Sequence, residues 1–199
     1  MSSLLYSRLI DTQRPSAAAL RTLVILVAGS AIITLSAKVS VPVWPVPVTL
    51  QTFAVAFLAA VAGRKLGVAI VLTYLAQGVA GLPVFATGGG PAYFTGPTAG
   101  FLLAYLPMAY IIGWAADRGA AKRPLLMLIT MLFADALLMA FGFIWLMSMA
   151  GNATWIDSSN PILSAWRGAV EPFILWDALK MGLAAALAGV CSSMSPKEA

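Results

Sequence analysis

The sequence predicts an all-α integral membrane protein with six transmembrane helices, and two observations carry this prediction. Of the 199 residues, 61% are hydrophobic and only 10% are charged, with a mean hydropathy of +0.92. So few charged residues do not cover the surface of a water-soluble domain. Several apolar stretches approach or exceed the roughly 20 residues that cross a bilayer as a helix. We therefore expect a single six-helix transmembrane domain over residues 1–199, embedded in a lipid bilayer.

The charge balance and the rare residue types exclude several classes of function. The net charge of +5 is not clustered as in nucleic-acid-binding proteins, so no nucleic-acid partner is expected. A single cysteine, Cys191, excludes an internal disulfide. The lack of histidine removes the commonest metal ligand and the His-dependent catalytic triads. No GxxxxGK[ST] motif is present, so any ATP hydrolysis would come from another subunit. We expect no metal site and no cofactor.

The expected helices follow one another, separated by polar turns or by segments rich in proline and glycine. A polar lead over residues 1–21 precedes the first helix. A signal peptide is the alternative there, but no small-residue cleavage site follows and more apolar sequence does. The expected helix bounds are approximately 22–38, 49–62, 68–79, 98–115, 124–150 and 172–191.

Two connections have compositions that indicate more than a linker. The segment Val41-Pro-Val-Trp-Pro-Val-Pro47 is not helical, because its three prolines lack backbone donors and favour extended neighbours. The loop over residues 81–100 holds six glycines, three prolines, three aromatic residues and no charge. Glycine lets the backbone approach a ligand closely, and loops of this length are often functional. A flexible connector is the alternative, but such linkers lack aromatic residues.

The positions of the basic residues predict the orientation of the chain in the membrane. Six helices place alternate connections on opposite sides, and nine of the twelve basic residues then fall on one side: Arg8, Arg14, Arg21, Arg64, Lys65, Arg118, Lys122, Arg123 and Lys197. Positive residues favour the cytoplasmic side. Both termini are therefore expected in the cytoplasm, with the two unusual connections and the start of the last helix at the outer face.

Charged residues within the apolar segments are the first candidates for function, because ionisable groups in a membrane are costly. Asp177 and Lys180 are three residues apart, on one face of the last expected helix. They either bind a ligand or form an interfacial salt bridge without one. Asp135 lies inside the fifth expected helix. It is either a hydrogen-bonding link between helices, which we favour, or a site of proton coupling.

The polar and aromatic groups expected at the outer face suit a small molecule with an apolar body and a carboxylate. Lys180 would attract the carboxylate, Asp177 would accept from ligand N–H groups, and aromatic side chains would pack on its rings. The expected ligand-binding residues are Thr49, Gln51, Phe85, Thr87, Gly88, Gly89, Tyr93, Trp176, Asp177 and Lys180.

Four motifs, in order along nearly the whole chain, resemble those of the BioY family. They are Val-Pro-Val-Trp-Pro-Val-Pro-Val-Thr-Leu-Gln51, Gly-Leu-Pro-Val-Phe85, Gly-Pro-Thr-Ala-Gly100 and Pro-Phe-Ile-Leu-Trp-Asp-Ala-Leu-Lys180. Members of this family are the biotin-specific S subunits of energy-coupling factor (ECF) transporters. The resemblance implies that the chain captures biotin in the cell membrane of a prokaryote. A transmembrane T subunit and ATPase subunits would then drive uptake.

The resemblance also implies that Asp177 and Lys180 form the Asp-x-x-Lys motif that helps to bind biotin, and that the two outer connections cover the site. One departure concerns docking to the T subunit. S subunits often carry Ala-x-x-x-Ala on the first helix, whereas this chain has Ser30 and Thr34 at that spacing. The same charged residues also allow two rival functions. One is a proton-coupled carrier that uses Asp135, and the other is an intramembrane enzyme that uses Asp177 and Lys180 as acid and base.

Overall fold

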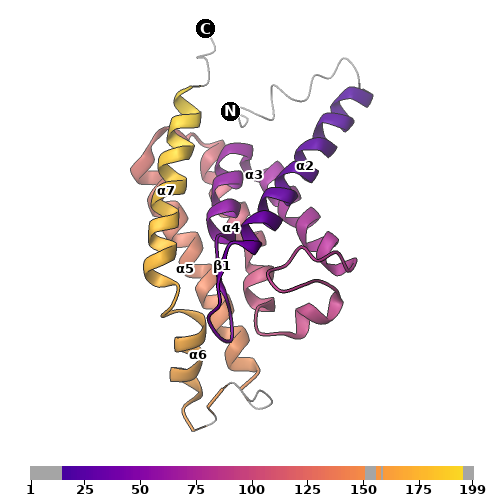
Figure 1. Ribbon diagram of the computed structural model, residues 1–199. Coiled ribbons are helices and arrows are strands. Elements are labelled where there is room, and N and C mark those ends of the chain that lie inside the picture. Colours follow the sequence, from indigo (N-terminus) through magenta and orange to yellow (C-terminus); the bar gives the residue numbers. More distant parts are fainter. Residues whose placement is uncertain (1–14, 151–155, 158, 195–199) are drawn as a thin grey trace.

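The fold is a bundle of helices with one small hairpin, seen in a computed structural model that describes residues 15–150, 156–157 and 159–194 (Figure 1). Of the polar lead expected over residues 1–21, residues 1–14 lie outside the described residues and the rest belongs to the first helix. The helices are α2 (Pro15–Lys38), α3 (Gln51–Val79), α4 (Ala99–Asp117), α5 (Pro124–Ser148), α6 (Pro161–Ala169) and α7 (Ile174–Ser193). Two short 3-10 helices are η1 (Pro91–Thr95) and η2 (Ala120–Lys122), and the strands are β1 (Ser40–Val41) and β2 (Val48–Thr49).

Five ranges of the described chain are long and apolar enough to cross a membrane, so the protein is a multi-pass membrane protein. They correspond to α2, α3, α4, α5 and one range from Pro161 to Ser193 that holds both α6 and α7. The expected count of six spanning helices is thus not reproduced.

The difference in count arises in α3, which covers both helices expected at residues 49–62 and 68–79. The backbone at Gly63 is non-helical (φ 79°, ψ 177°) and divides α3 into two segments. The segments then pack closely on each other, since a Cβ added to Gly67 would lie 2.9 Å from the Cα of Ala59. The turn that the expected bounds leave at residues 63–67 is therefore reduced to one residue, because glycine adopts a positive φ at no steric cost.

The other expected helices are present, with bounds shifted by at most seven residues, and the structure adds one helix that was not expected. Helix α2 begins at Pro15 rather than at residue 22, because proline suits the first turn and the alanines after it favour helix. The additional helix is α6, which lies in the segment expected as a loop between the fifth and the last helix. Its start is capped by the side chain of Asn160, which accepts from the N–H of Leu163, and Pro161 follows.

The connections that the sequence singled out lie between these helices. Strands β1 and β2 pair antiparallel, Ser40 with Thr49 and Val41 with Val48, so the proline-rich segment forms the tip of a hairpin. The loop after α3, residues 80–98, contains η1. Figure 1 shows the hairpin beside α3 and α7, with the start of α2 and the end of α7 at the same end of the molecule.

Small residues at four-residue spacing pack inside this bundle. Ala56, Ala60, Ala184 and Ala188 are all buried within the chain. Ser30 of α2 is buried as well, next to Gly29, where an added Cβ would lie 2.8 Å from the side chain of Ile70. These small residues bring helices of the same chain together.

Candidate ligand-binding site

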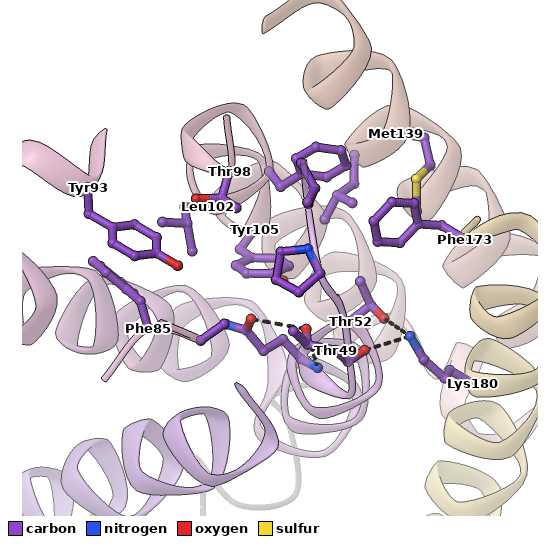
Figure 2. A pocket seen from close by; sticks show the side chains of 16 residues that line it. Thr49, Thr52, Phe85, Tyr93, Thr98, Leu102, Tyr105, Met139, Phe173 and Lys180 are labelled. Carbon is purple, nitrogen blue, oxygen red and sulfur yellow. Dashed lines mark hydrogen bonds between the residues drawn. The ribbon is translucent and has the colours of Figure 1, made fainter. Parts of the chain in front are cut away.

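A cavity lies where the hairpin, the 80–98 loop and helices α3, α4, α5 and α7 meet (Figure 2). Figure 2 shows Phe85 and Tyr93 at one end of it, and Met139, Phe173 and Lys180 at the other. Its volume is about 30 Å³. Such a space holds one or two water molecules, whereas pockets for small organic ligands measure roughly 300–1,000 Å³. A ligand of that size therefore requires the segments around the cavity to move apart.

Lys180 supplies the positive charge of the cavity wall, and three acceptors hold its ammonium group in place. Its Nζ donates to the carbonyl oxygen of Thr49 at 2.6 Å and to Oδ1 of Asp177 at 2.5 Å. A longer contact of 3.5 Å reaches Oγ1 of Thr52. The lysine side chain is 12% exposed and that of Asp177 is fully buried. The predicted salt bridge thus exists, and its cationic end faces a cavity.

Asp177 lies behind Lys180 rather than in the wall of the cavity. Its Oδ1 also accepts from the hydroxyl of Thr52 at 3.0 Å, so Thr52 and Lys180 share one acceptor. A buried carboxylate is stable only when paired in this way. In this arrangement Asp177 positions Lys180, and Lys180 presents the charge.

Neutral hydrogen-bonding groups extend from β2 across the start of α3. The hydroxyl of Thr49 donates to Oε1 of Gln51 at 3.0 Å, and Nε2 of Gln51 donates to the hydroxyl of Tyr74 at 2.7 Å. The hydroxyl of Tyr74 in turn donates to the carbonyl of Val84 at 3.4 Å. This chain of bonds fixes the amide of Gln51 and joins the hairpin to the 80–98 loop.

Aromatic rings close the opposite end of the cavity. Phe85 is fully buried, with its ring centroid 5.4 Å from that of Tyr74, 4.7 Å from that of Tyr93 and 5.6 Å from that of Phe94. The carbonyl of Phe85 accepts from Nζ of Lys38, the last residue of α2. Such rings offer flat apolar surfaces on which a ligand ring system packs.

The structure brings five of the ten predicted ligand-binding residues to the cavity wall: Thr49, Gln51, Phe85, Tyr93 and Lys180. Four others do not line it. Trp176 is 55% exposed on α7, one residue before the buried Asp177. Thr87 is exposed and pairs with the hydroxyl of Tyr93 at 3.1 Å, while Gly88 and Gly89 shape the loop beside it. Gly88 forms a bridge with Phe85 and has a φ of 153°.

Sequence reasoning did not select several residues of the wall, among them Thr52, Tyr105 and Phe173. Thr52 had a signal, since it follows Gln51 directly. Tyr105 and Phe173 had none that was specific. Both faces of a membrane helix are apolar, so hydrophobic periodicity does not identify the face that turns inward.

Comparisons with known proteins agree with this architecture. The model of the BioY family matches residues 10–197. The chain is 38% identical over 129 residues to the biotin transporter BioY2 of Lactococcus lactis, an alignment that spans 64% of this chain and 70% of the relative. It is 33% identical over 160 residues to a probable biotin transporter BioY of Pyrococcus horikoshii, spanning 79% of this chain and 88% of the relative.

A biotin transporter BioY of Thermotoga maritima is 43% identical over 90 residues, an alignment that spans 53% of that relative's length. Among solved structures, the chain resembles the S-component for biotin from an ECF-type ABC transporter, with a TM-score of 0.75 and 26% identity. That match covers 88% of this chain and 93% of the other. The resemblance based on the four sequence motifs is therefore confirmed, and the chain belongs to the BioY family.

Proposed function

We propose that this chain is the biotin-binding membrane subunit of a vitamin uptake transporter. The observation that carries the proposal is the position of Lys180, which Thr49, Thr52 and Asp177 hold against the cavity. Biotin has a fused ring system with one hydrogen-bonding ureido group, and a carboxylate. The cavity has aromatic rings at one end and a cation at the other, so it is complementary to both parts of the molecule.

The proposal includes the partners and the orientation in the membrane. The chain captures biotin at the outer face of a prokaryotic cell membrane, with both termini in the cytoplasm. A transmembrane T subunit and ATPase subunits of an ECF transporter supply the energy for uptake. The charge distribution of the connections and the likeness to an S-component for biotin support this assignment. The ligand is released unchanged, as in a carrier.

Equilibrium binding of biotin to the purified chain in detergent, measured by calorimetry without any other subunit, tests the proposal. We expect tight binding that an analogue with an altered ring system does not compete away. Lys180→Ala should weaken binding at least tenfold, because a hydrogen bond to a charged group contributes roughly 1.5–3 kcal/mol. Lys122→Met, which removes an exposed cation from η2, is the matched control and should bind as the wild type does.

Removal of Lys180 leaves the buried Asp177 without its cation, which destabilises the fold. The double variant Asp177→Asn/Lys180→Ala removes both charges and keeps the cluster neutral. It should stay folded, as judged by thermal unfolding in detergent, and should also bind biotin weakly. Wild-type affinity in this folded double variant would contradict the assignment of the site. Failure of the wild-type chain to bind biotin would contradict the function.

A further inference from the structure

Asp135 is a second buried carboxyl group beside the Lys180–Asp177 pair. It lies on α5, one turn before Leu138 and Met139, which line the cavity. Its carboxyl group lies close enough to that of Asp177 on α7 for the two to interact directly. A hydrogen bond between two carboxyl groups requires that one of them carries a proton, because two carboxylates have no hydrogen to donate.

Two buried oxygens without hydrogen-bond partners in the described structure support a proton shared between these carboxyl groups. Oδ1 of Asp135 and Oδ2 of Asp177 are buried, and neither has a donor among the described residues. Buried polar atoms in native proteins are almost always hydrogen-bonded. A proton held between the two carboxyl groups supplies the missing donor without any additional group.

The charge of the cluster also favours one proton. With both carboxyl groups ionised, Lys180 would face two adjacent negative charges in an apolar interior, and like charges at such sites disfavour full ionisation. With both protonated, Lys180 would have no counterion. A single proton gives a neutral set, and the neighbouring phenols of Tyr74 and Tyr105 add no charge at neutral pH.

The donors around the pair decide which group holds the proton. Oδ1 of Asp177 accepts from both Lys180 and Thr52, and these donors stabilise its ionised form. No comparable donor reaches Oδ1 of Asp135 within the described part of the chain. We propose that Asp135 is a protonated positioning residue, whose hydroxyl donates to Asp177 and thereby keeps the other oxygen of Asp177 directed at Lys180. This inference rests on the proposed function of Lys180 in biotin binding.

Two substitutions test whether Asp135 acts as a neutral hydrogen-bond donor or through a negative charge. Asp135→Asn keeps a neutral donor of the same shape and should bind biotin within about threefold of the wild type. Asp135→Leu removes the donor and should weaken binding at least tenfold. In an Asp177→Asn background the cost of Asp135→Leu should largely disappear, because Asp135 acts through Asp177. Met131→Leu, a buried apolar change on α5, is the control for repacking.

Three results would overturn the inference: an Asn variant as weak as the Leu variant, a Leu variant with wild-type affinity, or a full cost that persists in the Asp177→Asn background. A second measurement does not depend on biotin. Infrared spectra at neutral pH should show the carbonyl band of a buried carboxylic acid in the wild type and not in Asp135→Asn. A wild-type spectrum without the band, or a band that persists in Asp135→Asn, would refute the shared proton. A wild-type chain that shows the band without binding biotin would contradict only the proposed function.

Discussion

The ring of Phe85 keeps its position because Gly78 has no side chain. The ring of Phe85 lies over Gly78, where an added Cβ would overlap with the ring atoms. The N–H of Gly90 also reaches the carbonyl of Gly78, at 2.7 Å. Gly78 thus lets the 80–98 loop lie directly on α3 and keeps Phe85 at the wall of the cavity.

We expect Gly78→Ala to displace the ring of Phe85, lowering the biotin affinity about tenfold and the thermal stability with it, since overpacking costs roughly 1–3 kcal/mol. Calorimetry and thermal unfolding in detergent measure the two effects. The control is Gly182→Ala on α7, where no atom lies within 4 Å of an added Cβ, and it should bind normally. Wild-type affinity in Gly78→Ala would show that the ring position does not matter for binding.

At the residue scale, the predicted residues that carry a charge or sit beside a proline lie in the cavity wall or directly behind it. Lys180, Asp177 and the hairpin tip could be selected because charges in apolar sequence and clustered prolines have few structural roles. Tyr105 and Phe173 could not, because in a bilayer their neighbours on the lipid side are equally apolar. Trp176 was selected as an aromatic residue at the expected outer face, but adjacent helical residues point in different directions, and Trp176 points away from the cavity that Lys180 lines.

At the scale of elements, the two segments of α3 depend on the backbone of Gly63. Its φ of 79° and ψ of 177° lie in a region that is essentially restricted to glycine. Helix α4 prevents the backbone from relaxing there, because an added Cβ at Gly113 would lie 2.8 Å from the carbonyl carbon of Gly63. Sequence reasoning found both segments but not their close packing, because the turn between them looked longer than it is.

We expect Gly63→Ala to destabilise the protein by roughly 1–3 kcal/mol, the cost of a residue in such a conformation. Gly119→Ala is the matched comparison, since Gly119 also has a positive φ (85°) but a left-handed helical ψ of 12° and open space around it. There the cost should be smaller, about 1 kcal/mol. Thermal unfolding in detergent compares the two variants, and an equal loss would contradict the role given to Gly63.

For the whole molecule, the fold places the beginning of α2 and the end of α7 at the same end, and the hairpin lies away from that end (Figure 1). The proposed orientation puts the first end in the cytoplasm and the hairpin toward the outside. Ser193, the last residue of α7, and Val41, which is 58% exposed on β1, are suitable reporters of the two sides.

In a Cys191→Ser background, Val41→Cys should react with a membrane-impermeant maleimide on intact spheroplasts, because the proposed orientation places it outside. Ser193→Cys should react only after the membrane is permeabilised. Labelling yields on the purified variants, read from a gel shift, show that both thiols are reactive. The opposite pattern of labelling would reverse the proposed orientation.

The 80–98 loop is bonded near both of its ends, to two different helices. Lys38 of α2 donates to the carbonyl of Phe85, and the indole N–H of Trp145 on α5 donates to the carbonyl of Gly96 at 2.9 Å. Because the cavity is too small for biotin with its surrounding segments in place, entry of the vitamin requires these segments, of which the 80–98 loop is one, to move apart. The free energy needed to keep these segments apart in the bound state is subtracted from the free energy of binding, so it changes the dissociation constant as well as the association rate. Each anchoring bond that breaks on binding therefore lowers the affinity for the vitamin and slows its association, while it keeps the walls of the empty site ordered.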